Sequence, residues 1–290
     1  MSTRMSEAVS ASRFISKCNG ESQSAIIEAN NNLRYLVKWK DSPQGAKAIL
    51  HEILGTTLYE GMGLPVPQWT SMEVSDDFID ANPAMWLKIN GKSVRPAAGM
   101  QFASLKVGDS PQKVLEILPG SWHSRILNCT DFWGALTVDV WAEHQSNRQA
   151  LFIQNPGTPY LIAVFVDQKN MFGYAAACPK AQLRKCSYLD TRIYSRASMI
   201  YGLNLWIGRI QKYGPSAVAR LQNMGSDRGT ETAVNRISER LLNRITRLDE
   251  LIFPAIFQWL PIESEVSAFT TRRDTIRFRP STVGIGSATS

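Results

Sequence analysis

The sequence has few cysteines and histidines, and those it has lack the spacing of metal or disulfide sites. The four cysteines are scattered without a CxxC pair, which argues against a zinc ribbon and against a disulfide framework. The three histidines form no HExxH motif, which argues against a zinc metalloprotease and against a histidine-rich metal site. Any metal is therefore expected to be held by oxygen ligands, and the thiols are expected to be reduced.

Long apolar runs are also missing. No uninterrupted run reaches the roughly 18 residues that a membrane span needs, and the start of the chain, Met1-Ser2-Thr3-Arg4, leads into no apolar signal core. We therefore expect a soluble, cytoplasmic protein with no membrane partner. The chain has 290 residues, of which 44% are hydrophobic, so it can bury a sizeable core in one large domain or two lobes.

Acidic residues are outnumbered by basic ones. There are 32 lysines and arginines against 25 aspartates and glutamates, a net charge of +7, which favours contact with nucleic acid, phosphates or acidic surfaces. Part of the excess lies in residues 272–279, within a stretch, 261–290, that we expect to be a flexible, solvated tail. No helix-turn-helix pattern is visible, so association with nucleic acid is kept only as an alternative.

The first part of the chain is expected to be rich in strands. Residues 1–13 are rich in serine and are expected to be a flexible N-terminus. Alternation over residues 33–40 predicts a strand with Lys38 on its second face, and residues 24–28 read as its hairpin partner. A helix is predicted over residues 46–62. Glu52 falls on its apolar side, where a carboxylate needs a cation.

The second part is expected to be mainly helical. Residues 76–108 contain prolines and glycines and are predicted to be a loop-rich connection between lobes. Asp131 is predicted to be the N-cap of a helix that ends by Glu143, and two strands are predicted after it, near residues 150–154 and 161–166. Further helices are predicted at about residues 189–212, 216–223 and 230–253. The last has an apolar stripe opposite a row of arginines that we expect to be solvated, namely Arg236, Arg240, Arg244 and Arg247.

Three charged residues occur in an order typical of phosphoryl-transfer enzymes. Lys38 is on a strand, Glu52 is on the inner face of the next helix, and Asp167 follows the second strand of a later hairpin. In a protein-kinase-like fold, residues in this order have fixed roles: the lysine holds the nucleotide phosphates, the glutamate positions that lysine, and the aspartate binds magnesium. The sequence therefore predicts that these three residues meet at one site.

Further segments agree with this order, and the sequence resembles the HipA-like kinases, in the branch of short stand-alone bacterial domains. The resemblance runs from about residue 22 to residue 251. It rests on Tyr35-Leu36-Val37-Lys38-Trp39-Lys40, Pro43-Gln44-Gly45, His51-Glu52, Gly63-Leu64-Pro65-Val66-Pro67, Asp139-Val140-Trp141, Arg148-Gln149-Ala150-Leu151-Phe152 and Val166-Asp167.

The resemblance implies a fold, cofactors and an activity. The fold is α+β and bilobal, with a small β-rich N-lobe over residues 14–85 and a larger, mainly helical C-lobe over residues 86–260. The cofactors are ATP and Mg²⁺. The activity is transfer of a phosphoryl group to a serine or threonine of a protein. The candidate nucleotide-binding residues are Lys38, Glu52, Ser22 and Gln23. The implied metal ligand is Asp167, and Gln149 is a further candidate.

The sequence departs from this family where the proton acceptor belongs. Family members carry Asn-x-Asp before the Arg-Gln pair, and this chain has His144-Gln145-Ser146 there. A serine hydroxyl is a far poorer base than a carboxylate, so transfer is expected to be slow or lost, as in a pseudokinase that acts through a protein partner. The alternative is an active kinase with a non-standard base, for which His144 and Glu143 are candidates, while Gln149 could add a metal ligand. The family's Asn-Glu pair is His51-Glu52 here, and the glycine-rich opening is thinned.

Overall fold

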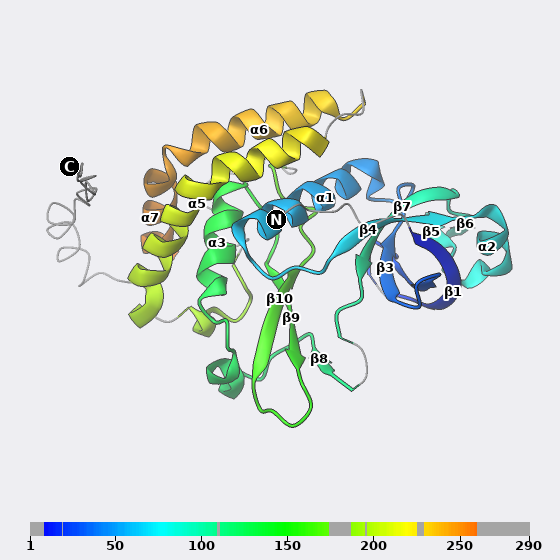
Figure 1. Cartoon of the computed structure of the whole chain (residues 1–290), viewed down its shortest axis with the longest axis horizontal. Helices are drawn as coiled ribbons and strands as arrows, with labels where there is room; N and C mark the ends of the chain where they lie inside the picture. The colour runs from blue at the N-terminus through cyan, green and yellow to red at the C-terminus, as the bar shows by residue number, and fades with distance from the viewer. Residues whose placement is uncertain are drawn as a thin grey trace, which may run out of the picture.

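The computed structural model of the chain describes residues 9–18, 20–108, 111–173, 187–194, 196–224 and 229–259. It has a β-barrel at one end, helices at the other, and a long β-hairpin between them (Figure 1). The predicted basic tail, 261–290, lies outside the described residues, as do residues 1–8 of the predicted flexible N-terminus. Within the described ranges, no helix has both the length and the apolar composition needed to cross a membrane.

Five strands close the barrel. They are β1 (Val9–Lys17), β2 (Ala25–Ala29), β3 (Arg34–Lys38), β4 (Trp69–Val74) and β7 (Gly99–Leu105), in the order β1-β2-β3-β7-β4, and parallel pairing of β1 with β4 completes the ring. Alternate side chains fill the interior, so that Ile27, Val37 and Met72 are fully buried. The predicted hairpin of β2 and β3 is confirmed.

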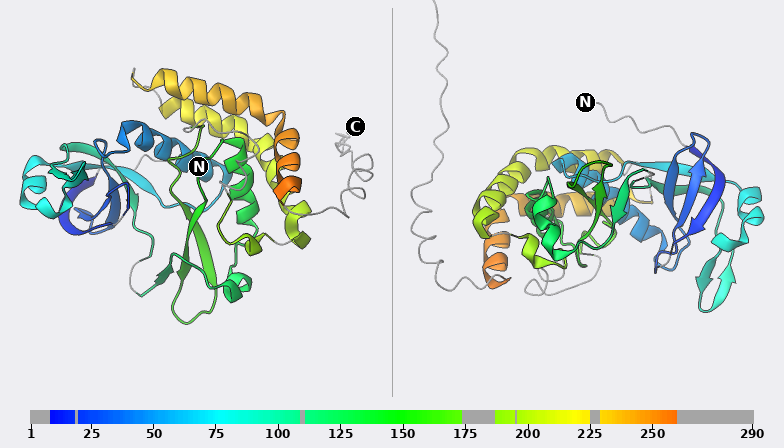
Figure 2. Two further views of the ribbon diagram at one scale, coloured as in Figure 1. Left: turned by 180° about the vertical axis from the view of Figure 1, so that it is seen from behind. Right: turned by 90° about the horizontal axis from the view of Figure 1, so that it is seen from below.

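The helix after β3, α1 (Gly45–Met62), has the predicted extent. It ends because Gly63 adopts φ +74°, the left-handed conformation that glycine tolerates best. The helix leaves the barrel and packs along α5, as the view from below shows (Figure 2). Helix α1 therefore connects the barrel to the helical end of the molecule, and Glu52 lies in the middle of this helix.

Three predictions for the first part of the chain are wrong: the loop-rich connection over residues 76–108, the end of the N-lobe at residue 85, and the flexible N-terminus up to residue 13. Residues 76–108 form α2 (Asp76–Ala81), the short helix η1 (Pro83–Met85), β5 (Leu87–Ile89), β6 (Lys92–Val94) and β7. Pro83 and Gly99 begin elements instead of interrupting them. Because β7 lies between β3 and β4, the barrel extends past residue 85 to Leu105. Strand β1 begins at Val9, so residues 9–13 are not part of a flexible end.

A second sheet joins the barrel end to the helices. It consists of β8 (Lys113–Leu115), β9 (Gln149–Gln154) and β10 (Leu161–Val166), and the predicted pair β9 and β10 is confirmed. The short helices η2 (Gly120–Arg125) and η3 (Thr191–Ile193) lie close to each other. Helix α3 (Asp131–Trp141) begins one residue earlier than predicted, because Thr130 and not Asp131 is its N-cap, and all its residues except the first are buried.

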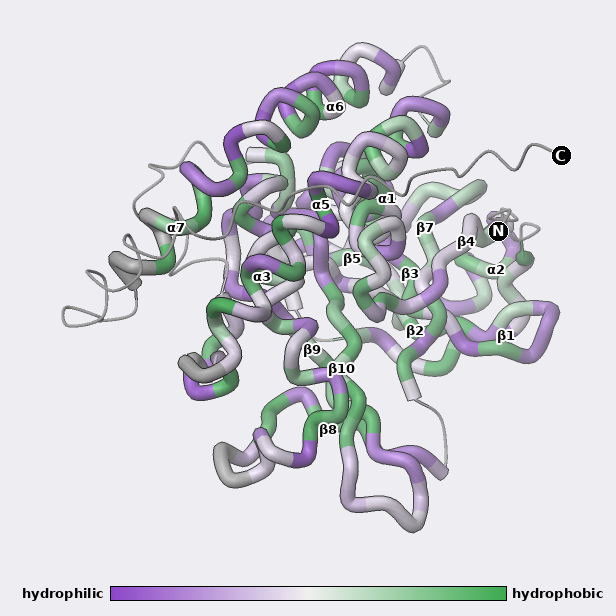
Figure 3. Tube along the Cα trace, turned by 60° about the vertical axis from the view of Figure 1, so that its left-hand side comes forward, coloured by the Kyte–Doolittle hydropathy of each residue, from purple (hydrophilic) through white to green (hydrophobic). Residues whose placement is uncertain are grey.

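The C-terminal helices are α5 (Arg196–Met224), α6 (Glu231–Ile245) and α7 (Leu248–Trp259). The predicted break at Pro215 is wrong, because α5 runs through it. Ala217, Val218 and Leu221 beyond the proline are buried, so core packing offsets the lost hydrogen bond. Helix α6 alternates hydrophilic and hydrophobic residues (Figure 3), and the predicted inner residues Ile237, Leu241 and Ile245 are buried.

Helices α3 and α5 cross at two reciprocal contacts between glycine and tryptophan. A Cβ atom on Gly134 would come within 2.3 Å of the Trp206 ring, and one on Gly202 within 2.8 Å of the Trp133 ring. Only glycine allows this approach. The crossing fixes α3, whose C-terminal end leads into the segment that carries Ser146.

Candidate functional site

Lys38, Glu52 and Asp167 meet where the barrel, α1 and the second sheet come together. The Lys38 Nζ lies 3.0 Å from Glu52 Oε2 and 3.3 Å from Asp167 Oδ1. The three side chains are 11%, 6% and 14% exposed, so the charges are mostly shielded from water. The predicted convergence of these residues is therefore present in the structure.

Local structure explains why these side chains point at one another. Lys38 is the last residue of β3 and, by strand alternation, faces away from the barrel interior that Val37 helps to fill. Glu52 lies in the middle of α1 on the side that is buried. Asp167 directly follows β10 with φ +64°, a left-handed conformation that is uncommon for aspartate outside turns and functional sites.

A fourth charged residue, Lys169, completes the cluster. Its Nζ lies 3.0 Å from the Asp167 carboxylate, and its backbone N–H donates a hydrogen bond to Glu52 Oε2 at 2.9 Å. The cluster thus contains two ammonium groups and two carboxylates. Its formal charge is zero when all four groups are ionised.

The mutual contacts favour the charged forms of Lys38 and Asp167. Burial opposes the charged form of Lys38, but the carboxylates of Glu52 and Asp167 raise the pKa of the lysine above its ordinary value. Burial likewise opposes ionisation of Asp167, but Lys38 and Lys169 lower the pKa of this carboxyl below its ordinary value. An anionic ligand that reaches this site therefore meets the protonated ammonium group of Lys38.

A fully buried ion pair lies behind the cluster. Arg148 Nη2 donates to Asp139 Oδ1 at 2.6 Å and Arg148 Nε donates to Oδ2 at 2.8 Å, with neither side chain exposed. The Tyr59 hydroxyl also donates to Asp139 at 2.6 Å, and Arg148 Nη1 donates to the carbonyl of Val166 at 3.1 Å. This pair connects α1, α3 and the end of β10, and it fixes the backbone one residue before Asp167.

Ser146 lies beside the loop that follows Asp167. Asn170 Nδ2 donates to Ser146 Oγ at 3.0 Å, and Ser146 Oγ lies 3.4 Å from His144 Nε2. His144 is fully buried, and burial together with the nearby Arg148 lowers the pKa of its imidazole to about 4. The imidazole is therefore neutral at neutral pH and, as a base, weaker than an exposed histidine.

The other predicted site residues are placed differently. Gln149 Nε2 lies 3.4 Å from Asp167 Oδ2, so this residue is at the site. The Gln23 side chain instead binds the backbone N–H and carbonyl of Lys88, at 2.6 and 2.8 Å. Ser22 Oγ lies 3.0 Å from Ser24 Oγ. The structure thus ties Gln23 to the β5–β6 hairpin and not to the lysine and carboxylate cluster.

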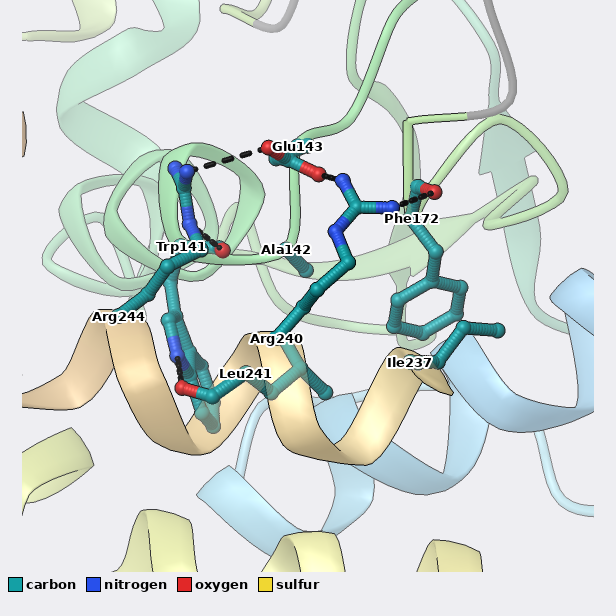
Figure 4. Close-up of a pocket in the computed structure, with 8 residues that line it drawn as sticks. All are labelled: Trp141, Ala142, Glu143, Phe172, Ile237, Arg240, Leu241 and Arg244. Atoms are coloured by element: carbon teal, nitrogen blue, oxygen red, sulfur yellow. Dashed lines mark hydrogen bonds and ion pairs between the residues drawn. The ribbon is translucent and has the colours of Figure 1, made fainter. Parts of the chain in front are cut away.

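Two of the arginines predicted to be solvated hold the end of α3 instead. They line a small pocket with Trp141, Ala142, Glu143, Phe172, Ile237 and Leu241, shown in Figure 4. Arg244 donates to the carbonyls of Val140 at 2.8 Å and Trp141 at 2.7 Å, and both Arg240 and Arg244 pair with Glu143. Burial and the neighbouring arginines lower the pKa of Arg244 to about 10. Glu143 is therefore held at this pocket by two cations.

Sequence reasoning missed Lys169, Asn170 and the partners of Glu143. Lys169 and Asn170 lie two and three positions after Asp167, a spacing that could have drawn attention to them. Nothing local indicates that α6 reaches the segment after α3, because that contact joins residues about one hundred positions apart.

Comparison with known proteins supports the fold. No protein-family model matches the sequence, and no curated protein matches it significantly. The structure is similar to the proinflammatory kinase CtkA of Helicobacter pylori, with a TM-score of 0.53 and 11% identity over 86% of this chain and 99% of that one. Two structures of the Golgi casein kinase, one with Mn/ADP bound, give TM-scores of 0.48 and 0.46 at 9% and 10% identity, covering 84% and 85% of this chain and 73% of theirs. The likeness to CtkA shows a kinase-like α+β fold.

Proposed function

We propose that this protein binds ATP at the cluster of Lys38, Glu52 and Asp167, transfers phosphoryl groups weakly or not at all, and acts through a protein partner. It would be a degenerate relative of the HipA-like kinases with a bilobal arrangement. The observation that carries the proposal is the position of Lys38, whose ammonium contacts both carboxylates across three elements of a kinase-like fold. In kinases this arrangement positions a lysine for the nucleotide phosphates.

The weak-transfer part of the proposal rests on Ser146. In the family its position holds the aspartate that accepts or positions the proton of the substrate hydroxyl. A serine there can accept a hydrogen bond but cannot take up the proton at neutral pH. Loss of general base catalysis lowers the rate of transfer by a factor of about 10²–10⁴. Nucleotide binding does not need this residue and is expected to remain.

One observation favours the second candidate, an active kinase with a non-standard base. Because Ser146 Oγ lies 3.4 Å from His144 Nε2, a proton could pass from a substrate hydroxyl through Ser146 to the imidazole. Two facts weaken this route. His144 is fully buried, and its pKa of about 4 makes the protonated imidazole unfavourable at neutral pH.

The nucleic-acid alternative has less support. Arg240 and Arg244, which the sequence placed on a solvated basic row, are engaged with Glu143 and with backbone carbonyls. The row therefore presents less free positive charge than its sequence indicates. A salt-dependent mobility shift with DNA or RNA would detect such binding.

A thermal-shift titration with ATP and magnesium tests nucleotide binding, since a ligand of the folded state raises the melting temperature. We expect a shift for the wild type and none for Lys38→Met. Lys40→Met is the matched control, because Lys40 is exposed near the same strand end, and it should keep the shift. Absence of a shift in the wild type at millimolar ATP would overturn the proposal.

Transfer is measured separately with radiolabelled ATP and magnesium, with the protein alone and with cell extract. We expect little label. Robust labelling that Asp167→Asn abolishes would favour the second candidate, the active kinase.

A further inference from the structure

The cluster around Asp167 contains one more positive charge than the predicted kinase site requires. The three predicted residues, Lys38, Glu52 and Asp167, sum to a charge of −1, which a divalent cation would offset. Lys169 adds its ammonium at 3.0 Å from the Asp167 carboxylate, and the sum becomes zero. The electrostatic reason for a divalent cation at this carboxylate is therefore reduced.

Both carboxylate oxygens of Asp167, the predicted metal ligand, are already engaged. Asp167 Oδ1 faces Lys38 Nζ at 3.3 Å, and Asp167 Oδ2 accepts from Lys169 Nζ at 3.0 Å and lies 3.4 Å from Gln149 Nε2. Glu52 Oε2 is taken by Lys38 and by the backbone N–H of Lys169. Asp167 therefore has only side-chain partners in this cluster, whereas Glu52 also accepts a hydrogen bond from the backbone.

These residues fit a divalent cation poorly. Magnesium in nucleotide sites is held by one or two carboxylates together with the phosphates, in near-ideal octahedral geometry. A cation at Asp167 would also have to displace the Lys169 ammonium or lie beside it against like-charge repulsion.

We propose that the Lys169 ammonium takes the place of the divalent cation, so that this protein binds a nucleoside triphosphate without metal. Lys169 and Lys38 would together neutralise the phosphates. A lysine can do this because its ammonium is a compact charge on a flexible stem, and the Lys169 side chain is partly exposed at 16%, against 11% for Lys38. Its backbone N–H, held by Glu52, keeps the base of the side chain in place.

The inference rests on the proposed nucleotide binding and deepens it. In kinases the metal also neutralises charge that develops during transfer. A site in which lysines replace the metal is therefore suited to holding a nucleotide and poorly suited to turning it over. This agrees with Ser146 at the position of the family's proton acceptor.

The test is isothermal titration of the full chain with ATP, once in excess EDTA and once in excess magnesium. We expect the wild-type affinities in the two conditions to agree within about threefold, and Lys169→Gln to bind at least about tenfold more weakly in EDTA, with recovery in magnesium. Lys169→Arg, which keeps the charge, should bind in EDTA. Lys92→Gln is the control for loss of an exposed lysine on β6 and should behave as the wild type.

The outcomes separate the two proposals. Wild-type binding only in magnesium would overturn the role of Lys169 and leave the proposed nucleotide site standing. Equal binding of the wild type and Lys169→Gln in EDTA would also overturn it. Absence of binding in both conditions would overturn both proposals. Melting curves without ligand show whether each variant is folded. If Lys169→Gln does not fold, the affinity of Lys169→Arg for ATP in EDTA still tests the role of the charge.

Discussion

Asp139 and Arg148 form a bidentate ion pair with N–O distances of 2.6 and 2.8 Å, and neither side chain is exposed to solvent. Asp139 is near the end of α3, and Arg148 immediately precedes β9. The pair therefore fixes the segment between them, which contains His144 and Ser146. It also holds the carbonyl of Val166 next to Asp167.

Removing one member of this pair is expected to be strongly destabilising. Arg148→Met leaves the Asp139 carboxylate buried without its cation, and such changes cost about 3–5 kcal/mol of unfolding free energy. Chemical denaturation measures the loss. Arg247→Met is the matched control, because the Arg247–Glu250 pair is exposed at 68% and 66% and such pairs contribute about 0–1 kcal/mol. Equal losses in the two variants would contradict the prediction.

Gly55 is expected to tolerate no side chain. A Cβ atom there would lie 2.6 Å from Gln168 Cβ and 2.7 Å from Met171 Sδ, so Gly55→Ala pushes α1 away from the loop after Asp167 and should cost about 1–3 kcal/mol. Gly208→Ala is the control, since nothing lies within 4 Å of its Cβ position in the interior of α5. It should stabilise the protein by about 0.4–1 kcal/mol. Thermal unfolding of both variants decides the point, and a neutral Gly55→Ala would contradict the close packing.

Ser146→Asp is expected to increase phosphoryl transfer. The substitution supplies a carboxylate that can accept the proton of a substrate hydroxyl, and general base catalysis contributes about 10²–10⁴ in rate, so at least a tenfold rise over the wild type is expected. Label transfer from ATP in magnesium measures it. Ser146→Asn has a similar size without a proton acceptor and should give no rise. If the two variants behave alike, the missing base is not what limits transfer.

Stability is expected to fall as the pH drops from about 6.5 towards 4. Burial lowers the pKa of His144 from 6.5 to about 4, so the unfolded chain binds a proton in this range that the folded protein does not. The neutral histidine's contribution is fully present above pH 6.5 and is lost as the pH falls, by up to about 3 kcal/mol.

Denaturation of the wild type and of His144→Gln at a series of pH values measures this dependence. The variant should lose less stability on acidification. His51, whose pKa burial also lowers to about 4, contributes in the same direction and remains in both proteins. The depressed pKa of Asp167 acts only below its ordinary value of 3.8 and lies outside this range. Parallel curves for the two proteins would contradict the prediction.

Elements formed by local interactions followed from the sequence. The alternation of residues 33–40, the turn before them and the glycine after α1 predicted the β2–β3 hairpin and both ends of α1, because strand periodicity and left-handed glycine are properties of neighbouring residues. The order of Lys38, Glu52 and Asp167 also predicted which charges would meet. Strand β7 and the path of α5 through Pro215 were missed, because distant packing partners stabilise both.

The sequence by itself determined a mixed α+β chain with a lysine, a glutamate and an aspartate in kinase-like order, and a serine in place of the expected base. Only the tertiary structure decided that Lys169 faces Asp167, that Asp139 is paired with Arg148, and that Arg240 and Arg244 hold Glu143. The physical reason is that the strength of a charge's interactions depends on its burial and on the charges near it in space. Except for Lys169 and Asp167, these partners are 9 to about 100 residues apart in the sequence, and folding alone brings them into contact.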